Sequence, residues 1–222
     1  MDSKTIVLVP LFLTLKVAGI ATLIAFLIGV ITAFLLARGR SWARQWLDAL
    51  FTLPLVLPPT VLGYYLLVLF GRNGVIGKWL EEVFGISLIF TWQGAVAAST
   101  VVSLPLVIKA AKAAFEGVDR NLENASRTLG LNEFEVFFRV SFPLAWPGIL
   151  AGTMLAFARA MGEFGATLMV AGNLPGKTQT LSLAVYDAIQ AGNNKLATVL
   201  VLITTVVCIF ILVFSDKILK SR

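Results

Sequence analysis

Histidine is absent from the 222-residue sequence, and cysteine occurs once, at Cys208. The lack of histidine excludes sites that need an imidazole, such as a Ser–His pair or a His-ligated metal centre. A single cysteine excludes an internal disulfide and a thiolate cluster. Charged residues are also scarce, at 14% of the chain. We therefore expect no catalytic residues, no metal site and no cofactor, and a protein that is not itself an enzyme.

Hydrophobic residues are abundant instead. They make up 58% of the sequence, and the mean hydropathy is +0.90, which is typical of membrane proteins. The 18 Lys and Arg residues outnumber the 12 Asp and Glu residues, but they lie between apolar runs. We interpret this excess as the basic bias of cytoplasmic loops and not as a nucleic-acid-binding surface. The expected surroundings are a lipid bilayer.

Five apolar runs predict an all-α polytopic membrane protein with a single transmembrane domain over residues 1–222. The predicted spans are residues 17–37, 49–70, 88–108, 148–170 and 196–214. Residues 5–15 are too few for a span, which needs about 20, so we expect an interfacial lead into the first span. Residues 71–87 and 171–195 are expected to be loops.

The distribution of basic residues predicts the orientation of these spans. Eleven Lys and Arg residues fall on the side that holds the loops after the first and third spans and the C-terminal tail. Six fall on the other side, and Arg159 lies within a span. The richer side should be cytoplasmic, which puts the N-terminus outside and the C-terminus inside.

The second and fourth spans carry features that are unusual in a membrane helix. Pro54, Pro58 and Pro59 must kink or break the second span. Broken membrane helices often face a water-filled path, although a kink that serves packing alone is equally compatible. In the fourth span, Arg159 and Glu163 are four residues apart and able to pair. They form either a structural ion pair or, with Pro58 and Pro59, part of the border of an anion path.

Small residues recur every four positions in the first and fourth spans. Such stripes predict close helix–helix contacts within the membrane. They comprise Ala21, Ala25, Gly29, Ala33 and Ala37 in the first span, and Gly148, Gly152, Ala156 and Ala160 in the fourth.

The one long polar segment, residues 114–147, predicts a helix–glycine–helix hairpin. Asp119 is placed to cap the first helix, and Gly130 is placed to end it in a left-handed turn. Asn132 and Glu135 form a capping signal for a second helix, and Pro143 is expected to stop it.

This hairpin resembles the cytoplasmic loop of ABC-importer permeases. Their motif is E-A-A-x-x-x-G, then nine residues, then I-x-L-P. With the motif glycine at Gly130, the other motif positions hold Asn124, Ala125 and Ser126, and then Val140, Phe142 and Pro143. Asn124 and Ser126 depart from the motif, although Glu123 lies beside Asn124. The runs LPLVLPPTVLGYYLLVLFGRNGVIG and FARAMGEFGATL are similar to molybdate permease subunits.

The resemblance implies the transmembrane subunit of an ATP-driven importer that carries molybdate across the cytoplasmic (inner) membrane. It implies two copies of a separate ATPase, an extracytoplasmic oxyanion-binding protein and a second copy of this chain. The residues that would couple to the ATPase are Glu123, Asn124, Ala125, Ser126, Arg127, Gly130 and Pro143. Permeases for tungstate or for sulfate and thiosulfate are the alternatives, and a membrane scaffold or channel without ATP coupling is a third class.

Overall fold

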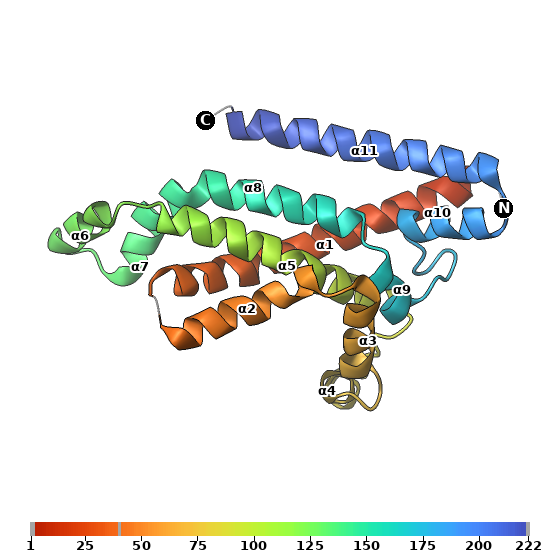
Figure 1. Cartoon of the computed structure of the whole chain (residues 1–222), viewed down its shortest axis with the longest axis horizontal. Coiled ribbons are helices and arrows are strands. Elements are labelled where there is room, and N and C mark those ends of the chain that lie inside the picture. Colours follow the sequence, from red (N-terminus) through yellow and green to blue (C-terminus); the bar gives the residue numbers. More distant parts are fainter. Residues whose placement is uncertain (1–2, 40, 221–222) are drawn as a thin grey trace.

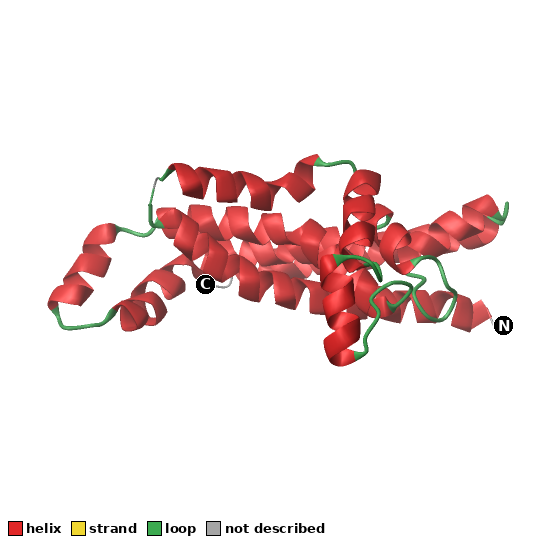
Figure 2. Cartoon of the chain, turned by 90° about the horizontal axis from the view of Figure 1, so that it is seen from below, coloured by secondary structure: helices red, strands yellow, loops and turns green. Residues whose placement is uncertain are grey.

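Four long helices run side by side along the length of the molecule. The computed structural model describes residues 3–39 and 41–220, and every regular element among them is helical (Figure 2). The long helices are α1 (Ser3–Ala37), α5 (Trp92–Glu116), α8 (Phe142–Met161) and α11 (Asn194–Lys220) (Figure 1). α1, α5 and α8 pack against one another, and α11 lies on α8 and α10 (Leu181–Gln190). The predicted fold class, an all-α protein with several apolar membrane helices, is confirmed.

α1 is one continuous helix of 35 residues. Residues 5–15, the predicted interfacial lead, and residues 17–37, the predicted first span, therefore belong to the same helix. Pro10 lies inside it, and Thr14, one turn later, donates its hydroxyl proton to the Pro10 carbonyl at 2.8 Å. A helix of 35 residues is about 50 Å long at 1.5 Å per residue, which is more than the roughly 30 Å membrane core. An interfacial position of residues 5–15 stays a prediction.

The two stripes of small residues lie against α5, as predicted. Ala25, Ala33 and Ala156 are fully buried. A Cβ built on Gly29 would lie 2.8 Å from Val107 Cγ1, and one built on Gly152 would lie 2.3 Å from Ala110 Cβ. Both distances are below van der Waals contact, so glycine is what allows these helices to approach so closely.

The second predicted span is broken, as its prolines indicate. α2 (Trp42–Val56) and α3 (Pro59–Phe70) meet at a bend of 114°. The break falls at Leu57 and Pro58, whereas Pro54 lies inside α2. α3 turns away from the long axis (Figure 1), so residues 49–70 do not form one straight helix.

The fourth predicted span, residues 148–170, is wrong as a single helix. A helical stretch begins earlier, at Glu133, and α8 ends at Met161. A short helix, α9 (Gly165–Ala171), follows after three residues. Glu163, in the gap, accepts a hydrogen bond from the Ala166 amide at 2.8 Å. Its carboxylate thus replaces the carbonyl that a continuous helix would offer to that amide.

Two segments that were expected to be loops contain helices. α4 (Val75–Phe84) lies between α3 and α5, and α10 occupies the middle of residues 171–195. In Figure 1, α4 is seen nearly end-on beyond α3, to one side of the long helices.

Four described helical stretches are long and apolar enough to cross a membrane, and the bent pair α2–α3 would make a fifth. Five crossings therefore remain a prediction. α1 begins at the end of the molecule far from α6 (Arg120–Thr128) and α7 (Glu133–Val136), and α11 runs back toward them (Figure 1).

Candidate functional site

The polar hairpin is built by local capping interactions. Asp119 Oδ1 accepts a hydrogen bond from the Asn121 amide at 2.8 Å and so caps α6. At the other end, Gly130 has φ +91°, in the left-handed region. The Gly130 amide donates to the Arg127 carbonyl and the Leu131 amide to the Ser126 carbonyl, at 3.0 and 3.2 Å. These two bonds form the Schellman motif, which confirms the predicted glycine turn.

The second arm of the hairpin starts as predicted but does not stop. Asn132 and Glu135 exchange side-chain and backbone hydrogen bonds in a capping box at the start of α7. The helix then widens into a π-helical segment, Phe137–Ser141, and continues directly into α8. The expected stop at Pro143 is wrong. The Phe142 amide bonds to the Phe137 carbonyl, and this wider turn lets Pro143 enter a continuous helix in its first turn.

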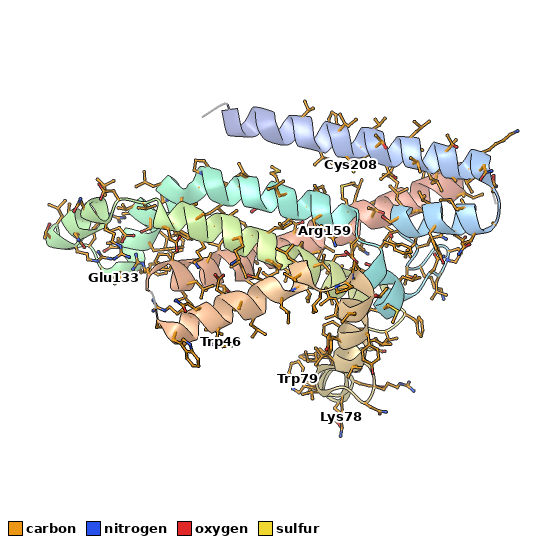
Figure 3. All side chains as sticks on the ribbon, viewed as in Figure 1. Trp46, Lys78, Trp79, Glu133, Arg159 and Cys208 are labelled. Atoms are coloured by element: carbon orange, nitrogen blue, oxygen red, sulfur yellow. The ribbon has the colours of Figure 1, made fainter. Side chains whose placement is uncertain are left out.

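An ionic network connects the hairpin to the end of α1. Glu123 Oε1 lies 3.0 Å from Arg38 Nη2, and Glu133 Oε2 lies 2.9 Å from Arg38 Nη1. Arg127 approaches Glu133 at 2.6 Å and Glu123 at 3.7 Å. The hydrogen bond to Glu133 is the main reason that the pKa of Arg127 is raised above its ordinary value. Figure 3 shows Glu133 at the hairpin end of the molecule.

Glu123 is the most enclosed member of this network. Its side chain is 14% exposed and also accepts a hydrogen bond from the Ser141 hydroxyl, at the base of α8. Asn124 joins through its side-chain oxygen, which lies 2.8 Å from Arg127 Nη1. Of the residues predicted for coupling, Glu123, Asn124 and Arg127 are thus brought together. Pro143 is exposed in the first turn of α8.

The apolar side of α6 is open to solvent. Leu122 is 49% exposed and Leu129 is 84% exposed, and no α6 residue is buried. Ala125 is exposed between them, and Ser126 turns its hydroxyl back to the Leu122 carbonyl. An amphipathic helix that leaves its apolar side uncovered in a single chain presents a surface for a partner.

A groove of about 1000 Å³ lies between α6 and the adjoining ends of α1, α2 and α5. Asp48, in its wall, holds Lys109 and Lys112 at 2.9 and 3.0 Å. Sequence reasoning missed Arg38, Glu133, Asp48 and Ser141. Arg38 lies 85 and 95 positions from its two carboxylate partners, and no short-range pattern in the sequence predicts such pairs.

A second polar site lies at the other end of α8 (Figure 3). Arg159 Nη1 is 2.8 Å from Glu163 Oε2, so the predicted pair forms. The Glu163 side chain is 1% exposed and the Arg159 side chain is 36% exposed. Since Glu163 Oε1 is taken by the Ala166 amide, the anion is buried and fixed while the cation remains accessible.

The breaks in the second and fourth predicted spans meet at this site. A Cβ built on Gly165 would lie 2.6 Å from Pro59 Cβ, and one on Gly63 would lie 2.8 Å from Met169 Cβ. α3 therefore packs on α9, and Pro59 lies close to the helix that Glu163 caps. Pro58 and Pro59 are themselves exposed.

Comparisons with known proteins agree with this architecture. Residues 25–222 match the family described as "Binding-protein-dependent transport system inner membrane component". The chain is 46% identical over 205 residues to "Molybdenum transport system permease protein ModB" of Escherichia coli K12, which covers 92% of this chain and 90% of that protein. It is 42% identical over 208 residues to "Putative molybdenum transport system permease protein YvgM" of Bacillus subtilis, covering 94% and 92%.

A more distant relative and two solved structures extend the comparison. "Probable sulfate transport system permease protein cysT" of Chlorella vulgaris is 34% identical over 212 residues, covering 95% of this chain and 79% of that protein. The inward-facing MetNI methionine ABC transporter superposes with a TM-score of 0.78 at 17% identity, covering 100% and 99%. A bacterial ABC transporter involved in alginate import superposes with a TM-score of 0.80 at 14% identity, covering 99% of this chain and 80% of that chain.

The two solved structures share the fold, and the family match and the sequence relatives cover nearly the whole chain. The chain is a multi-pass inner-membrane protein, and it belongs to the family of binding-protein-dependent transport system inner membrane components.

Proposed function

We propose that this chain is the transmembrane subunit of an ATP-driven importer that carries molybdate across the cytoplasmic membrane. The observation that carries the proposal is the 42–46% identity to permeases named for molybdenum transport, over at least 92% of this chain and 90% of each relative. Membership of a transport family argues against a scaffold. A sulfate permease is the second candidate, because the Chlorella vulgaris relative is 34% identical over most of the chain.

In this proposal the hairpin is the cytoplasmic contact with the ATPase. The exposed apolar side of α6, at Leu122, Ala125 and Leu129, would lie in a groove of the ATPase. Two ATPase copies would serve two copies of this chain, and ATP hydrolysis would take place entirely in the ATPase. An extracytoplasmic oxyanion-binding protein would deliver substrate at the opposite end. α1 begins at that end of the molecule, and α11 runs back toward the hairpin (Figure 1).

The translocation path would pass the two helix breaks. Pro58 and Pro59 are exposed at one break, and Arg159 is accessible beside the other. An oxyanion carries negative charge, and Arg159 offers a planar fork of N–H donors that suits oxygen acceptors. Buried Glu163 orients that fork and offsets the cost of a lone cation in the membrane.

The test is transport by the complete system in proteoliposomes. Permease, ATPase and binding protein from the same source are reconstituted, and the uptake of molybdate, tungstate and sulfate is measured with ATP inside or absent. Molybdate uptake that requires ATP, with sulfate uptake at background, is the expected result. Preferential sulfate uptake would support the second candidate, and uptake without ATP would refute both.

A further inference from the structure

The side chain of Arg38 occupies an unusual position at the foot of the hairpin. It follows the last residue of α1 and stacks on the Phe34 ring, 4.0 Å from the ring centroid. One guanidinium nitrogen faces Glu123 on α6, and another faces Glu133 on α7. A single planar fork therefore joins both arms of the hairpin to the longest helix in the described part of the chain.

The layer beneath this fork is aromatic and comes from several helices. Phe34 of α1 lies 5.2 Å from Phe115 of α5 and 4.5 Å from Phe137 of the π-helical segment, centroid to centroid. Phe137 in turn lies 5.7 Å from Phe142 of α8. Arg38 thus links the polar hairpin to a packed junction of α1, α5 and α8.

The hairpin has few other connections to the helical body. No residue of α6 is buried, and in α7 only Val136 is buried. Within the described residues, the side-chain polar contacts from α6 and α7 to the molecule outside residues 119–136 are those of Arg38, the hydrogen bond from Ser141 to Glu123 and the ion pair between Arg139 and Glu135. The base of α7 is a π-helical segment, a feature that often marks a functional hinge.

We propose that Arg38 is a positioning residue that clamps both arms of the coupling hairpin to α1, so that a displacement of the hairpin is transmitted into the membrane helices. This inference rests on the proposed function of the hairpin as the ATPase contact. Arg38 itself touches neither substrate nor nucleotide. Its role depends on the fork, because a lysine ammonium keeps the charge but lacks two separated donor nitrogens.

The test compares Arg38→Gln with Arg44→Gln in the reconstituted transporter. Arg44 lies in the same groove and has no ion pair within the described residues, so it controls for the loss of one positive charge. We expect Arg38→Gln to keep ATP hydrolysis but to lower the molybdate uptake per ATP hydrolysed. The expected loss is roughly fivefold or more, because coupling between two sites typically changes an affinity by about 5- to 150-fold. Arg44→Gln should keep the original ratio, and Arg38→Lys should fall between.

Hydrogen exchange provides a second, independent measurement on the full-length permease in nanodiscs. In Arg38→Gln the amides of residues 120–136 should exchange faster, because the hairpin opens locally once its clamp is lost. The amides of α5 and α8 should be unchanged. Where Arg38→Gln does not assemble with the ATPase, this measurement and the Arg38→Lys transport ratio decide the question.

The outcomes separate the two proposals. If the unmodified transporter carries no oxyanion, the proposed function is refuted. The rate of hydrogen exchange in the hairpin still tests the clamp, because it does not depend on transport. If the unmodified transporter works and Arg38→Gln shows unchanged hairpin exchange or an unchanged uptake ratio, the clamp is refuted. An equal loss in Arg44→Gln would also refute it, since general charge would then be the cause.

Discussion

At Gly130 a single backbone angle decides how the hairpin turns. Its φ is +91°, and a Cβ built there would meet no atom within 4 Å. A valine at this position would therefore be strained by the backbone alone, by about 1–2 kcal/mol. We expect Gly130→Val to weaken co-purification of the ATPase and to lower transport. Gly192→Val is the matched control, because Gly192 also has positive φ and open space but lies outside the hairpin. Equal ATPase binding by both variants would contradict the proposed contact.

Arg159 and Glu163 form a second residue-scale case, in which structural and transport roles make different predictions. Arg159→Lys should slow transport roughly tenfold or more if the guanidinium meets the anion, since a charge-assisted hydrogen bond contributes about 1.5–3 kcal/mol. Assembly should remain normal. The double variant Arg159→Gln, Glu163→Gln leaves no unpaired charge and should fold but not transport. Transport at the original rate by the double variant would show that the pair is only structural.

At the level of helices, α1 offers a direct test of close packing. A Cβ on Gly29 would lie 2.8 Å from Val107 Cγ1, whereas one on Gly19, in the same helix, would meet nothing within 4 Å. Gly29→Leu should therefore force α1 away from α5 at a cost of about 1–3 kcal/mol. Its thermal unfolding temperature in detergent should fall, and Gly19→Leu should unfold near the original temperature. A similar loss in both variants would mean that side-chain size alone, and not the α1–α5 contact, is responsible.

The other end of α1 is held by a buried hydrogen bond to α10. Thr14 is 3% exposed, and its hydroxyl accepts from the Leu181 amide at 2.8 Å. Thr14→Val keeps the shape but leaves that amide unsatisfied, which costs about 1–3 kcal/mol. We expect faster hydrogen exchange at Leu181 and in the first turn of α10. Thr32→Val, on the same helix, should change nothing there, because the Thr32 hydroxyl donates within its own helix, to the Ile28 carbonyl.

The helices also show which elements a sequence is able to predict. The caps at Asp119 and Asn132 and the turn at Gly130 were predicted correctly, because each depends on residues within a few positions. α4 was missed although Gly85, at its C-terminus, carried the same left-handed signal, with φ +64°. The gap after Met161 was missed for a different reason. Its residues lie in a run that is apolar apart from Arg159 and Glu163. Only the Glu163 contacts with Arg159 and the Ala166 amide show how the break is stabilised.

For the candidate site, the sequence predicted which residues form the hairpin, but it did not predict the contacts that join the hairpin to α1. The resemblance to permease loops placed Glu123, Asn124 and Arg127 in the expected ATPase-coupling segment, and their side chains do contact one another. The Arg38 partnership was not predictable, because it joins residues 85 and 95 positions apart. The meeting of Pro59 with Gly165 is likewise a tertiary contact. A proline break in one span and a glycine break in another can each be read from the sequence, but the sequence does not show whether the two breaks are in contact.

For the molecule as a whole, the question that decides its topology is whether α2 and α3 together cross the membrane. α2 has 15 residues, or about 22 Å of helix at 1.5 Å per residue, which is less than the roughly 30 Å hydrocarbon core. α3 turns through 114° before it can complete the crossing. In the structure, α2 nevertheless runs back from the hairpin end, and α5 begins near the opposite end (Figure 1). The pair should therefore act as one broken span.

Single cysteines at exposed positions test this crossing in a Cys208→Ser background. Ser41 precedes α2 and Ser87 lies between α4 and α5, and both are exposed. A membrane-impermeant maleimide should label Ser87→Cys in intact cells and Ser41→Cys only after permeabilisation. Thr128→Cys, in the hairpin, should behave like Ser41→Cys when the permease is expressed without its ATPase. If Ser41→Cys and Ser87→Cys are labelled from the same side, the broken span is refuted. That result would also contradict the parallel packing of α1 on α5, which places the starts of α2 and α5 at opposite ends of the molecule.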